Sequence, residues 1–411
     1  MKQKCLALFA LIFGLVATTW ASNETVLWNF SNSNGDGAFP WSNVLISDVN
    51  GNLYGVTGGG GSNSTGMVFE LSPNGNGGYS ETVIYDFKAS GSGDGSTPYG
   101  GLARDDAGNL YGATQGGGAN STGSVYMLSP KAGGNWTERI LYSFSASGAT
   151  DGSTPSGGVI IGKDRTLHGT TTYGGAYSSG TVFQISKTQS GITEKVLHNF
   201  GAPGDGEFPY DPVVADPEGN LYGATSIGGA SGSGCIYRLS LQNGSWSESV
   251  LYSFTGKNGD GSGMYYVGLI GDKSRDIYGT TAFGGANNTG TVWELVYSKA
   301  SNSYSEKILY TFGSTSSGDG NYPYAGITVD GTGALYGTTE QGGSTQNSGT
   351  VYKLTKSGST WTESIVHNFT GGSSDGQDPS GNLLLGSDGN LYGMAQYGGT
   401  SSDGIVYAIA P

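Results

Sequence analysis

The sequence predicts an all-β protein that folds as one seven-bladed β-propeller with four-stranded blades. Glycine accounts for 77 of the 411 residues, a composition that disfavours long helices. The triplet Leu-Tyr-Gly, or a near copy, occurs seven times at intervals of 54 to 58 residues, and four short apolar runs accompany each copy. Four strands per repeat and seven repeats are typical of a propeller. The triplet glycines are Gly55, Gly112, Gly169, Gly223, Gly279, Gly337 and Gly393.

The second repeat shows the four predicted strands most clearly. They cover residues 101–106, 109–114, 123–128 and 136–144. Each run is rich in Val, Ile, Leu and Tyr and is bounded by Gly, Asn, Asp or Pro, as expected for strands separated by turns. The pattern therefore predicts blades of four antiparallel strands.

The two ends of the chain predict how the ring closes. Residues 24–30 match the fourth strand of the other repeats, and residues 404–407 match the third strand. The last repeat thus lacks its outer strand, which the N-terminal segment would supply. This pairing would cover two open sheet edges and make residues 22–411 one domain.

The loops divide between two faces of the predicted ring. The turn between strands 1 and 2 would lie on one face, and a double-glycine loop and an Asp-Gly crossover would share the other. The Asp-Gly aspartates are predicted to be turn residues, with calcium ligation as an alternative; no other cofactor and no other metal site is expected. These aspartates are Asp36, Asp94, Asp151, Asp205, Asp260, Asp319 and Asp375.

Residues 1–21 resemble a secretory leader. Lys2 and Lys4 precede an apolar stretch over residues 6–17, and Thr19-Trp20-Ala21 follows as the cleavage-site segment, with small residues at its first and last positions. We therefore expect a secreted protein with no membrane span and no C-terminal anchor. Removal of the leader would leave Cys235 as the only cysteine, so no intrachain disulfide is expected.

Charge excludes one class of partner. The formal net charge is −14, and loss of the two leader lysines makes it −16. No basic run occurs, so nucleic-acid binding is not expected. The expected partner is a polysaccharide or a cell-envelope protein, bound by a monomer.

The ordered elements Asp-Gly-x-x-Pro, Gly-Asn-Leu-Tyr-Gly-x-Thr, Gly-Gly and Gly-Thr-Val-Tyr resemble the GloVer repeat family of bacterial exported proteins. The resemblance covers residues 24–411. It implies a propeller-like repeat fold and export. Members typically carry a C-terminal sorting tail, which this sequence lacks, and the resemblance implies no activity.

Aromatic residues on the crossover face are the predicted binding residues, because rigid rings with polar edges can stack on sugars. An alternative is that they seal one blade against the next. Ser156 and Ser380 replace the aromatic residue in the third and seventh repeats. The candidates that follow the crossover proline are Trp41, Tyr99, Tyr210 and Tyr324, with Tyr266 in the irregular fifth repeat. Those before the double glycine are Tyr173, Phe283 and Tyr397.

Three carboxylates on that face depart from the repeat. Glu340, Asp211 and Asp378 are the weak catalytic candidates, because a pair of carboxylates can provide acid and base groups. The favoured interpretation is that they are exposed polar substitutions. The histidines His168, His198 and His367 replace packed aromatic residues and are interpreted as structural.

The favoured function is therefore a secreted carbohydrate-binding module. The first alternative is an extracellular polysaccharide lyase or glycoside hydrolase, and the second is a structural or protein-binding propeller of the cell envelope. The sequence favours a binding protein over an enzyme without deciding between them.

Overall fold

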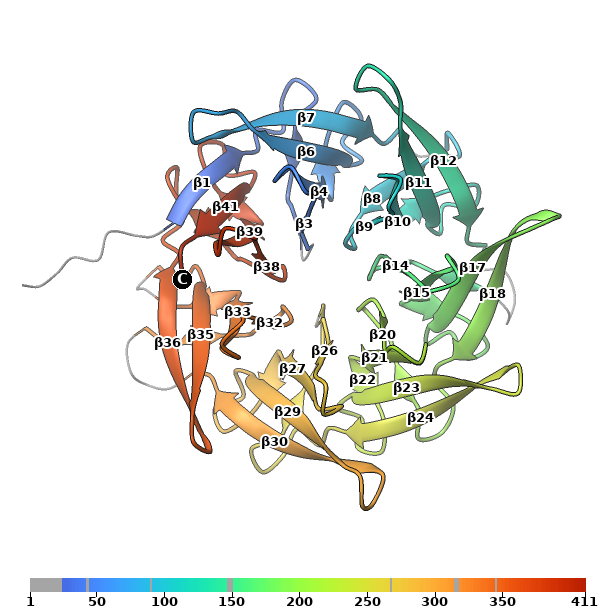
Figure 1. The fold of residues 1–411 in the computed structure, drawn as a ribbon, viewed down its shortest axis with the longest axis vertical. Coiled ribbons are helices and arrows are strands. Elements are labelled where there is room, and N and C mark those ends of the chain that lie inside the picture. The colour runs from blue at the N-terminus through green and yellow to red at the C-terminus, as the bar shows by residue number, and fades with distance from the viewer. Residues whose placement is uncertain are drawn as a thin grey trace, which may run out of the picture.

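Seven antiparallel sheets surround a central axis and form a closed ring of blades (Figure 1). The computed structural model describes residues 24–41, 44–88, 91–145, 151–266, 268–313, 318–343 and 346–411. The predicted leader lies outside these ranges. Within them, the predicted all-β class, the seven blades and their four-stranded sheets are confirmed.

Each blade runs from a short strand beside the channel to a long strand at the rim. The first strands are β3 (Ile46–Ser47), β9 (Ala103–Arg104), β14 (Val159–Ile161), β20 (Val214–Ala215), β26 (Ile270–Gly271), β32 (Thr328–Val329) and β38 (Leu384–Leu385). The second are β4 (Leu53–Thr57), β10 (Leu110–Gly117), β15 (Leu167–Thr171), β21 (Leu221–Thr225), β27 (Ile277–Thr281), β33 (Leu335–Thr339) and β39 (Leu391–Ala395). The third are β6 (Met67–Pro73), β11 (Ser124–Pro130), β17 (Thr181–Thr188), β23 (Cys235–Gln242), β29 (Thr291–Ser298), β35 (Thr350–Ser357) and β41 (Ile405–Ile409). The fourth are β7 (Tyr79–Asp86), β12 (Trp136–Ser143), β18 (Gly191–Asn199), β24 (Ser245–Ser253), β30 (Ser303–Thr311), β36 (Thr360–Asn368) and β1 (Glu24–Asn29).

The N-terminal strand closes the ring as predicted. β1 pairs antiparallel with β41, with Glu24 opposite Ile409 and Asn29 opposite Ile405. The innermost strands are shorter than predicted: in the second blade only β9 pairs within the expected 101–106 run. Gly101 instead forms a parallel bridge to Gly158 of the third blade, because the backbones converge near the axis.

Seven two-stranded ribbons connect each crossover to the double-glycine loop of its own blade. In the second blade, β8 (Gly95–Pro98) pairs with the end of β10. Gly117 of that ribbon has φ +71°, and a Cβ there would lie 2.4 Å from the Asp94 carbonyl oxygen, so only glycine fits. The other ribbons are β2 (Gly37–Ala38) with β5 (Gly59–Gly60), β13 (Gly152–Ser153) with β16 (Tyr173–Gly174), β19 (Gly206–Glu207) with β22 (Ile227–Gly228), β25 (Gly261–Ser262) with β28 (Phe283–Gly284), β31 (Gly320–Asn321) with β34 (Gln341–Gly342), and β37 (Gly376–Gln377) with β40 (Tyr397–Gly398).

An aromatic pair seals each blade interface. A fully buried phenylalanine after the fourth strand packs against a third-strand aromatic ring of the next blade, as Phe87 does on Tyr126 at 5.1 Å. That ring crosses the triplet glycine of its own blade: a Cβ on Gly112 would lie 2.3 Å from the Tyr126 hydroxyl. The triplet glycine is therefore required by close packing. The other six pairs are Phe30–Phe69, Phe144–Phe183, Phe200–Tyr237, Phe254–Trp293, Phe312–Tyr352 and Phe369–Tyr407.

The tyrosine of the triplet also has a structural partner. The Tyr111 hydroxyl donates a 3.1 Å hydrogen bond to Asp105 in the turn between strands 1 and 2. Asp105 also accepts from the backbone and side chain of Asn109. Although burial opposes them, these donors hold the pKa of Asp105 below its usual value. The Asp-x-x-Gly-Asn turn is thus fixed to the second strand.

Two further expectations concern membrane-spanning segments and cysteine pairing. None of the described segments forms a helix of the length and apolar character that crossing a bilayer requires. Cys235 is a buried free thiol, 3.3 Å from the Thr225 hydroxyl.

Candidate ligand-binding site at the channel mouth

The crossovers hold their aromatic residues on a rigid backbone clamp. The residue before the crossover proline has a left-handed backbone in the six repeats that have this proline, as at Thr97 with φ +55°, and Gly263 takes the same conformation in the fifth repeat. In the sixth blade, the Tyr322 N–H donates to Thr289 of the preceding blade, and its carbonyl accepts from Glu340 of its own blade. Each clamp thus joins two blades and fixes the position of the next aromatic side chain, which compensates for the strained conformation.

Six of these side chains make a continuous path of ring contacts across the axis. Trp41 packs on Tyr99 at 5.4 Å, and Tyr99 packs on Tyr266 at 5.4 Å. Because Tyr99 enters the second blade and Tyr266 the fifth, this contact spans the mouth of the channel. The path continues through Tyr210, Tyr265 and Tyr324, with centroid distances of 5.3–6.0 Å. We call these six residues the channel-mouth aromatics: Trp41, Tyr99, Tyr210, Tyr265, Tyr266 and Tyr324.

Tyr266 reaches the axis because the fifth crossover contains one residue more than its second-blade counterpart: residues 264–272 correspond to 98–105. Its φ of +58° is strained for a tyrosine. Its hydroxyl interacts with that of Tyr99, but burial is the larger effect and raises the pKa of Tyr266 to about 12. Burial also raises the pKa of Tyr99. Both hydroxyls therefore stay protonated at neutral pH.

The predicted aromatic residues differ in exposure. Tyr99 is buried at 9% exposure and supports its neighbours, whereas Tyr173 is 44% exposed. Trp41, Tyr210, Tyr266 and Tyr324 are half-buried, so part of each ring remains accessible. These rings thus pack on one another and keep part of their surface accessible, and their role as binding residues stays a prediction.

The aromatic residues before the double glycines form a second set. Phe283 contacts Tyr324 and Tyr322, while Tyr173 packs on Phe208 at 5.5 Å. Tyr397 packs on Phe39 at 5.8 Å.

Sequence reasoning missed four aromatic residues of this face. Three of them, Phe39, Phe208 and Tyr322, occupy the left-handed position immediately before the crossover proline or its equivalent. The fourth, Tyr265, follows Met264 in the irregular repeat and joins Tyr210 to Tyr324. The recurrence of aromatic residues before the proline was the available signal.

The charge of one candidate carboxylate, Asp378, acts on another, Glu340. Burial, followed by the charge of Asp378, raises the pKa of Glu340 to about 7. Burial likewise raises the pKa of Asp378. Burial, followed by the charge of Glu340, raises the pKa of Tyr324 to about 12. The Glu340 N–H donates to the Tyr322 carbonyl, two residues before Tyr324, so Glu340 lies beside the channel-mouth aromatics.

Asp211 lies in another part of the mouth. It is 1% exposed, and after burial, the larger cause, its charge contributes to the raised pKa values of Tyr266 and Tyr237. Its carbonyl accepts a 2.6 Å hydrogen bond from Thr170 of the preceding blade. Asp211 thus belongs to the wall of the fourth blade.

A small cavity lies between Tyr210, Tyr266 and the innermost backbone of several blades. Its volume is about 150 Å³, below the usual size of a ligand pocket. The surrounding backbones approach closely: a Cβ on Gly100 would lie 2.0 Å from the Gly158 nitrogen. A sugar-sized ligand would therefore lie on the channel-mouth aromatics and not inside the channel.

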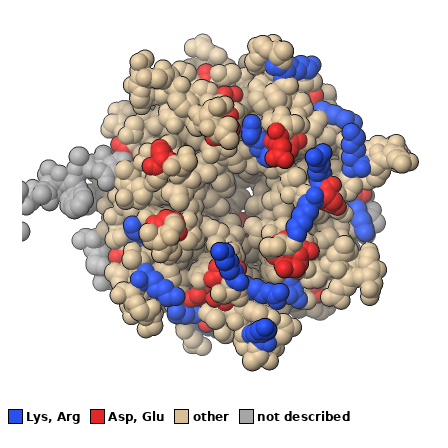
Figure 2. Space-filling model, viewed as in Figure 1, with Lys and Arg blue, Asp and Glu red and all other residues tan. Residues whose placement is uncertain are grey.

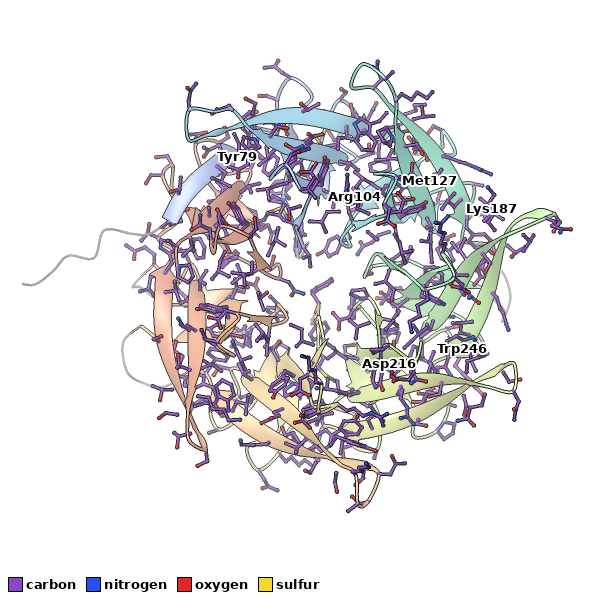
Figure 3. The ribbon with its side chains drawn as sticks, in the orientation of Figure 1. Tyr79, Arg104, Met127, Lys187, Asp216 and Trp246 are labelled. Carbon is purple, nitrogen blue, oxygen red and sulfur yellow. The ribbon has the colours of Figure 1, made fainter. Side chains whose placement is uncertain are left out.

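Charged side chains surround the central opening on the face shown in Figure 2, where basic and acidic groups alternate. Arg104, Lys163 and Arg165 line one inter-blade groove together with Asp105. Figure 3 shows Arg104 and Asp216 nearer the axis than Lys187 and Trp246, in agreement with the order of the strands. The mixture of charges distinguishes this groove from the aromatic surface.

The family comparison agrees with the seven repeats. Residues 12–150, 80–266 and 249–411 match the model of the Gloeobacter/Verrucomicrobia repeat. The chain belongs to this family. The membership confirms the resemblance based on the repeated motifs. No curated protein matches this member of the Gloeobacter/Verrucomicrobia repeat family.

Solved structures provide similarities of fold alone. A protein from Bacteroides uniformis, proposed to be a 6-phosphogluconolactonase, is 13% identical, with a TM-score of 0.49; the alignment covers 79% of this chain and 83% of that chain. A protein from Thermus thermophilus, proposed to be an oxidoreductase (glucose dehydrogenase), is also 13% identical, with a TM-score of 0.40 and coverage of 94% and 99%.

Proposed function

We propose that this protein is an exported carbohydrate-binding propeller whose ligand lies on the channel-mouth aromatics. The observation that carries the proposal is the unbroken path of ring contacts from Trp41 through Tyr99 and Tyr266 to Tyr324. Export is inferred from the leader-like residues 1–21.

The chemistry of these side chains suits sugar rings. The face of an aromatic ring is apolar and can pack on the C–H groups of a sugar, while tyrosine hydroxyls supply hydrogen bonds at the edge. Aromatic side chains also lose little conformational entropy on binding. Half-buried Tyr210 and Tyr324 have neighbouring rings that fix their orientation.

The test compares glycan binding by the wild-type protein and a Tyr210→Ala/Tyr324→Ala variant. Tyr99 is left intact because its burial makes its removal a risk to folding. Tyr177→Ala is the matched control, since Tyr177 is an exposed tyrosine outside the channel-mouth set, at 54% exposure. We expect the double variant to lose binding and the control to retain it. Equal binding by the double variant would reject this site.

The Glu340–Asp378 pair favours a second candidate, the cleavage of a bound polysaccharide. A carboxyl group with a pKa of about 7 can remain protonated and donate a proton to a leaving group. A second carboxylate nearby completes the usual pair of a glycoside hydrolase. Glu340→Gln should then abolish the formation of new reducing ends or unsaturated products while leaving glycan binding intact. Undiminished product formation by this variant would reject Glu340 as the acid.

A further inference from the structure

The structure assigns a second site, at the point where the ring closes: we propose that Glu24, His367 and Asp375 bind a divalent transition-metal ion of the Zn²⁺ class. Among the described residues, one ligand atom from each of these three side chains lies within 4.8 Å of the other two. Imidazole nitrogen and carboxylate oxygens are ordinary ligands of Zn²⁺ and its neighbours. The proposed metal site does not depend on glycan binding by the channel-mouth aromatics.

The spacing between two of the atoms is that of neighbouring metal ligands. His367 Nε2 and Asp375 Oδ1 are 3.3 Å apart, which is long for a charge-assisted hydrogen bond. Two ligands at tetrahedral bonds of about 2.0 Å are separated by about 3.3 Å. The equivalent pair at the interface between the third and fourth blades, His198 and Asp205, is only 2.9 Å apart and forms an ordinary hydrogen bond.

Glu24 provides the third ligand, and its Oε1 atom is buried without a hydrogen-bond partner in the described structure. The equivalent glutamates of the other six repeats share this feature, but among the described residues only Glu24 has both a histidine nitrogen and an aspartate oxygen within 4.8 Å of its carboxylate and of each other. A buried carboxylate oxygen without a partner is unfavourable, and a cation would compensate for it. The backbone of Glu24 is held by the pairing of β1 with β41, so the carboxylate remains at this interface.

The surrounding groups orient the other two ligands. The Asp375 Oδ2 atom accepts from the Thr370 N–H and hydroxyl, both at 2.8 Å. The Gly376 N–H donates to Oδ1 at 2.7 Å. The His367 ring packs edge-on against Phe369 at 4.6 Å. Such outer contacts position ligands before the ion binds.

A bound ion would join the N-terminal strand to a segment more than 340 residues later in the sequence, which carries the other two ligands eight residues apart. Glu24 lies in β1, His367 in β36 of the sixth blade and Asp375 in the crossover to the seventh. The ion would therefore fasten the N-terminal strand to the neighbouring blade, and ligand binding to the folded state would raise its stability. The function of the site would be to lock the closed ring.

The chain itself offers a conservative test variant. Four repeats have tyrosine at the position of His367: Tyr85, Tyr142, Tyr252 and Tyr310. His367→Tyr therefore introduces a residue that this scaffold already accepts and that is a poor Zn²⁺ ligand at neutral pH. His198→Tyr is the matched control, because it makes the same change in the interface with the shorter distance. Glu24→Gln keeps the shape of the side chain and removes its charge.

The experiment titrates untagged, chelator-treated protein with Zn²⁺, with Co²⁺ as a spectroscopic probe and with Ca²⁺. We expect one Zn²⁺ per chain, a higher melting temperature, and a Co²⁺ absorption band in the visible range. His367→Tyr and Glu24→Gln should weaken Zn²⁺ binding by about tenfold or more, and His198→Tyr should leave it unchanged. Absence of Zn²⁺ binding, equal binding by His367→Tyr, or binding of Ca²⁺ in preference to Zn²⁺ would overturn the proposal.

Discussion

Raising the pH from 5 to 8 should destabilise this propeller, because an acidic pair lies at each of the six blade interfaces outside the proposed metal site. In the first blade, burial and the charge of Asp36 raise the pKa of Glu81 to about 8. Five further glutamates on the fourth strands have pKa values of about 7 or 8 for the same reason, and each has a buried oxygen without a partner. These pairs are Glu138–Asp94, Glu194–Asp151, Glu248–Asp205, Glu306–Asp260 and Glu363–Asp319.

The direction of this change in stability follows from how many protons the folded and unfolded states bind. Each glutamate has a higher pKa in the folded state than its usual 4.5, so between about pH 4.5 and 8 the folded protein binds more protons than the unfolded chain. The stabilisation is complete below pH 4.5 and is lost as the pH rises through 7 and 8. His168 opposes this trend, because burial lowers its pKa, but it is a single group.

Partial exposure of the glutamates to solvent limits the loss of stability that each acidic pair causes. A rise in pKa from 4.5 to about 8 corresponds to roughly 5 kcal/mol for a fully buried group. These glutamates are half-buried, and we discount the effect to about 1 kcal/mol per pair. The six pairs lie in separate interfaces, so their effects add to about 6 kcal/mol.

The assay is urea unfolding at pH 5, 6, 7 and 8 at constant ionic strength. Glu81→Gln should reduce the loss between pH 5 and 8 by about 1 kcal/mol, because the amide keeps the shape and cannot ionise. Glu218→Gln, at an exposed glutamate, should leave the slope unchanged. Stability that is constant or rises from pH 5 to 8 would refute the account of the acidic pairs.

Three other substitutions test the packing, the crossover and the mouth. Gly112→Ala should lower the free energy of unfolding by about 1–3 kcal/mol, because its Cβ would overlap the Tyr126 ring. Gly331→Ala, with open space around it, should change that free energy by under about 0.5 kcal/mol, and equal effects of the two substitutions would contradict the packing argument. Asp94→Ala should lower the free energy of unfolding in urea by about 3 kcal/mol, because it removes the acceptor of the Tyr85 hydroxyl and of the Lys88 and Gly95 N–H groups. A loss no larger than that caused by Asp106→Ala, at an exposed aspartate, would contradict this structural role of Asp94. Tyr99→Phe should lower the melting temperature slightly by removing the hydroxyl contact with Tyr266, and an unchanged value would argue against that contact.

Most of the architecture was predictable because each repeat contains its own strand and turn signals. The ring closure followed from two unmatched strands, at residues 24–30 and 404–407. The sequence did not reveal why the triplet needs glycine at Gly112. That requirement depends on the Tyr126 ring, which crosses it from the adjacent strand.

The candidate site was less predictable, because its contacts join different blades. The contact of Tyr99 with Tyr266 depends on the radius of the ring and on one extra residue in the fifth crossover. The pairing of Glu81 with Asp36 likewise requires the blades to be in place. Periodicity locates such residues within a repeat, but it does not specify which side chains meet across an interface or across the axis.

The most direct test of the central claim is a glycan array followed by calorimetric titration of the best ligand into the wild-type protein, the Tyr210→Ala/Tyr324→Ala variant and the Tyr177→Ala control. The account predicts specific binding by the wild type and the control and none by the double variant. An array without specific binding, or a double variant that binds as tightly as the wild type, would contradict it.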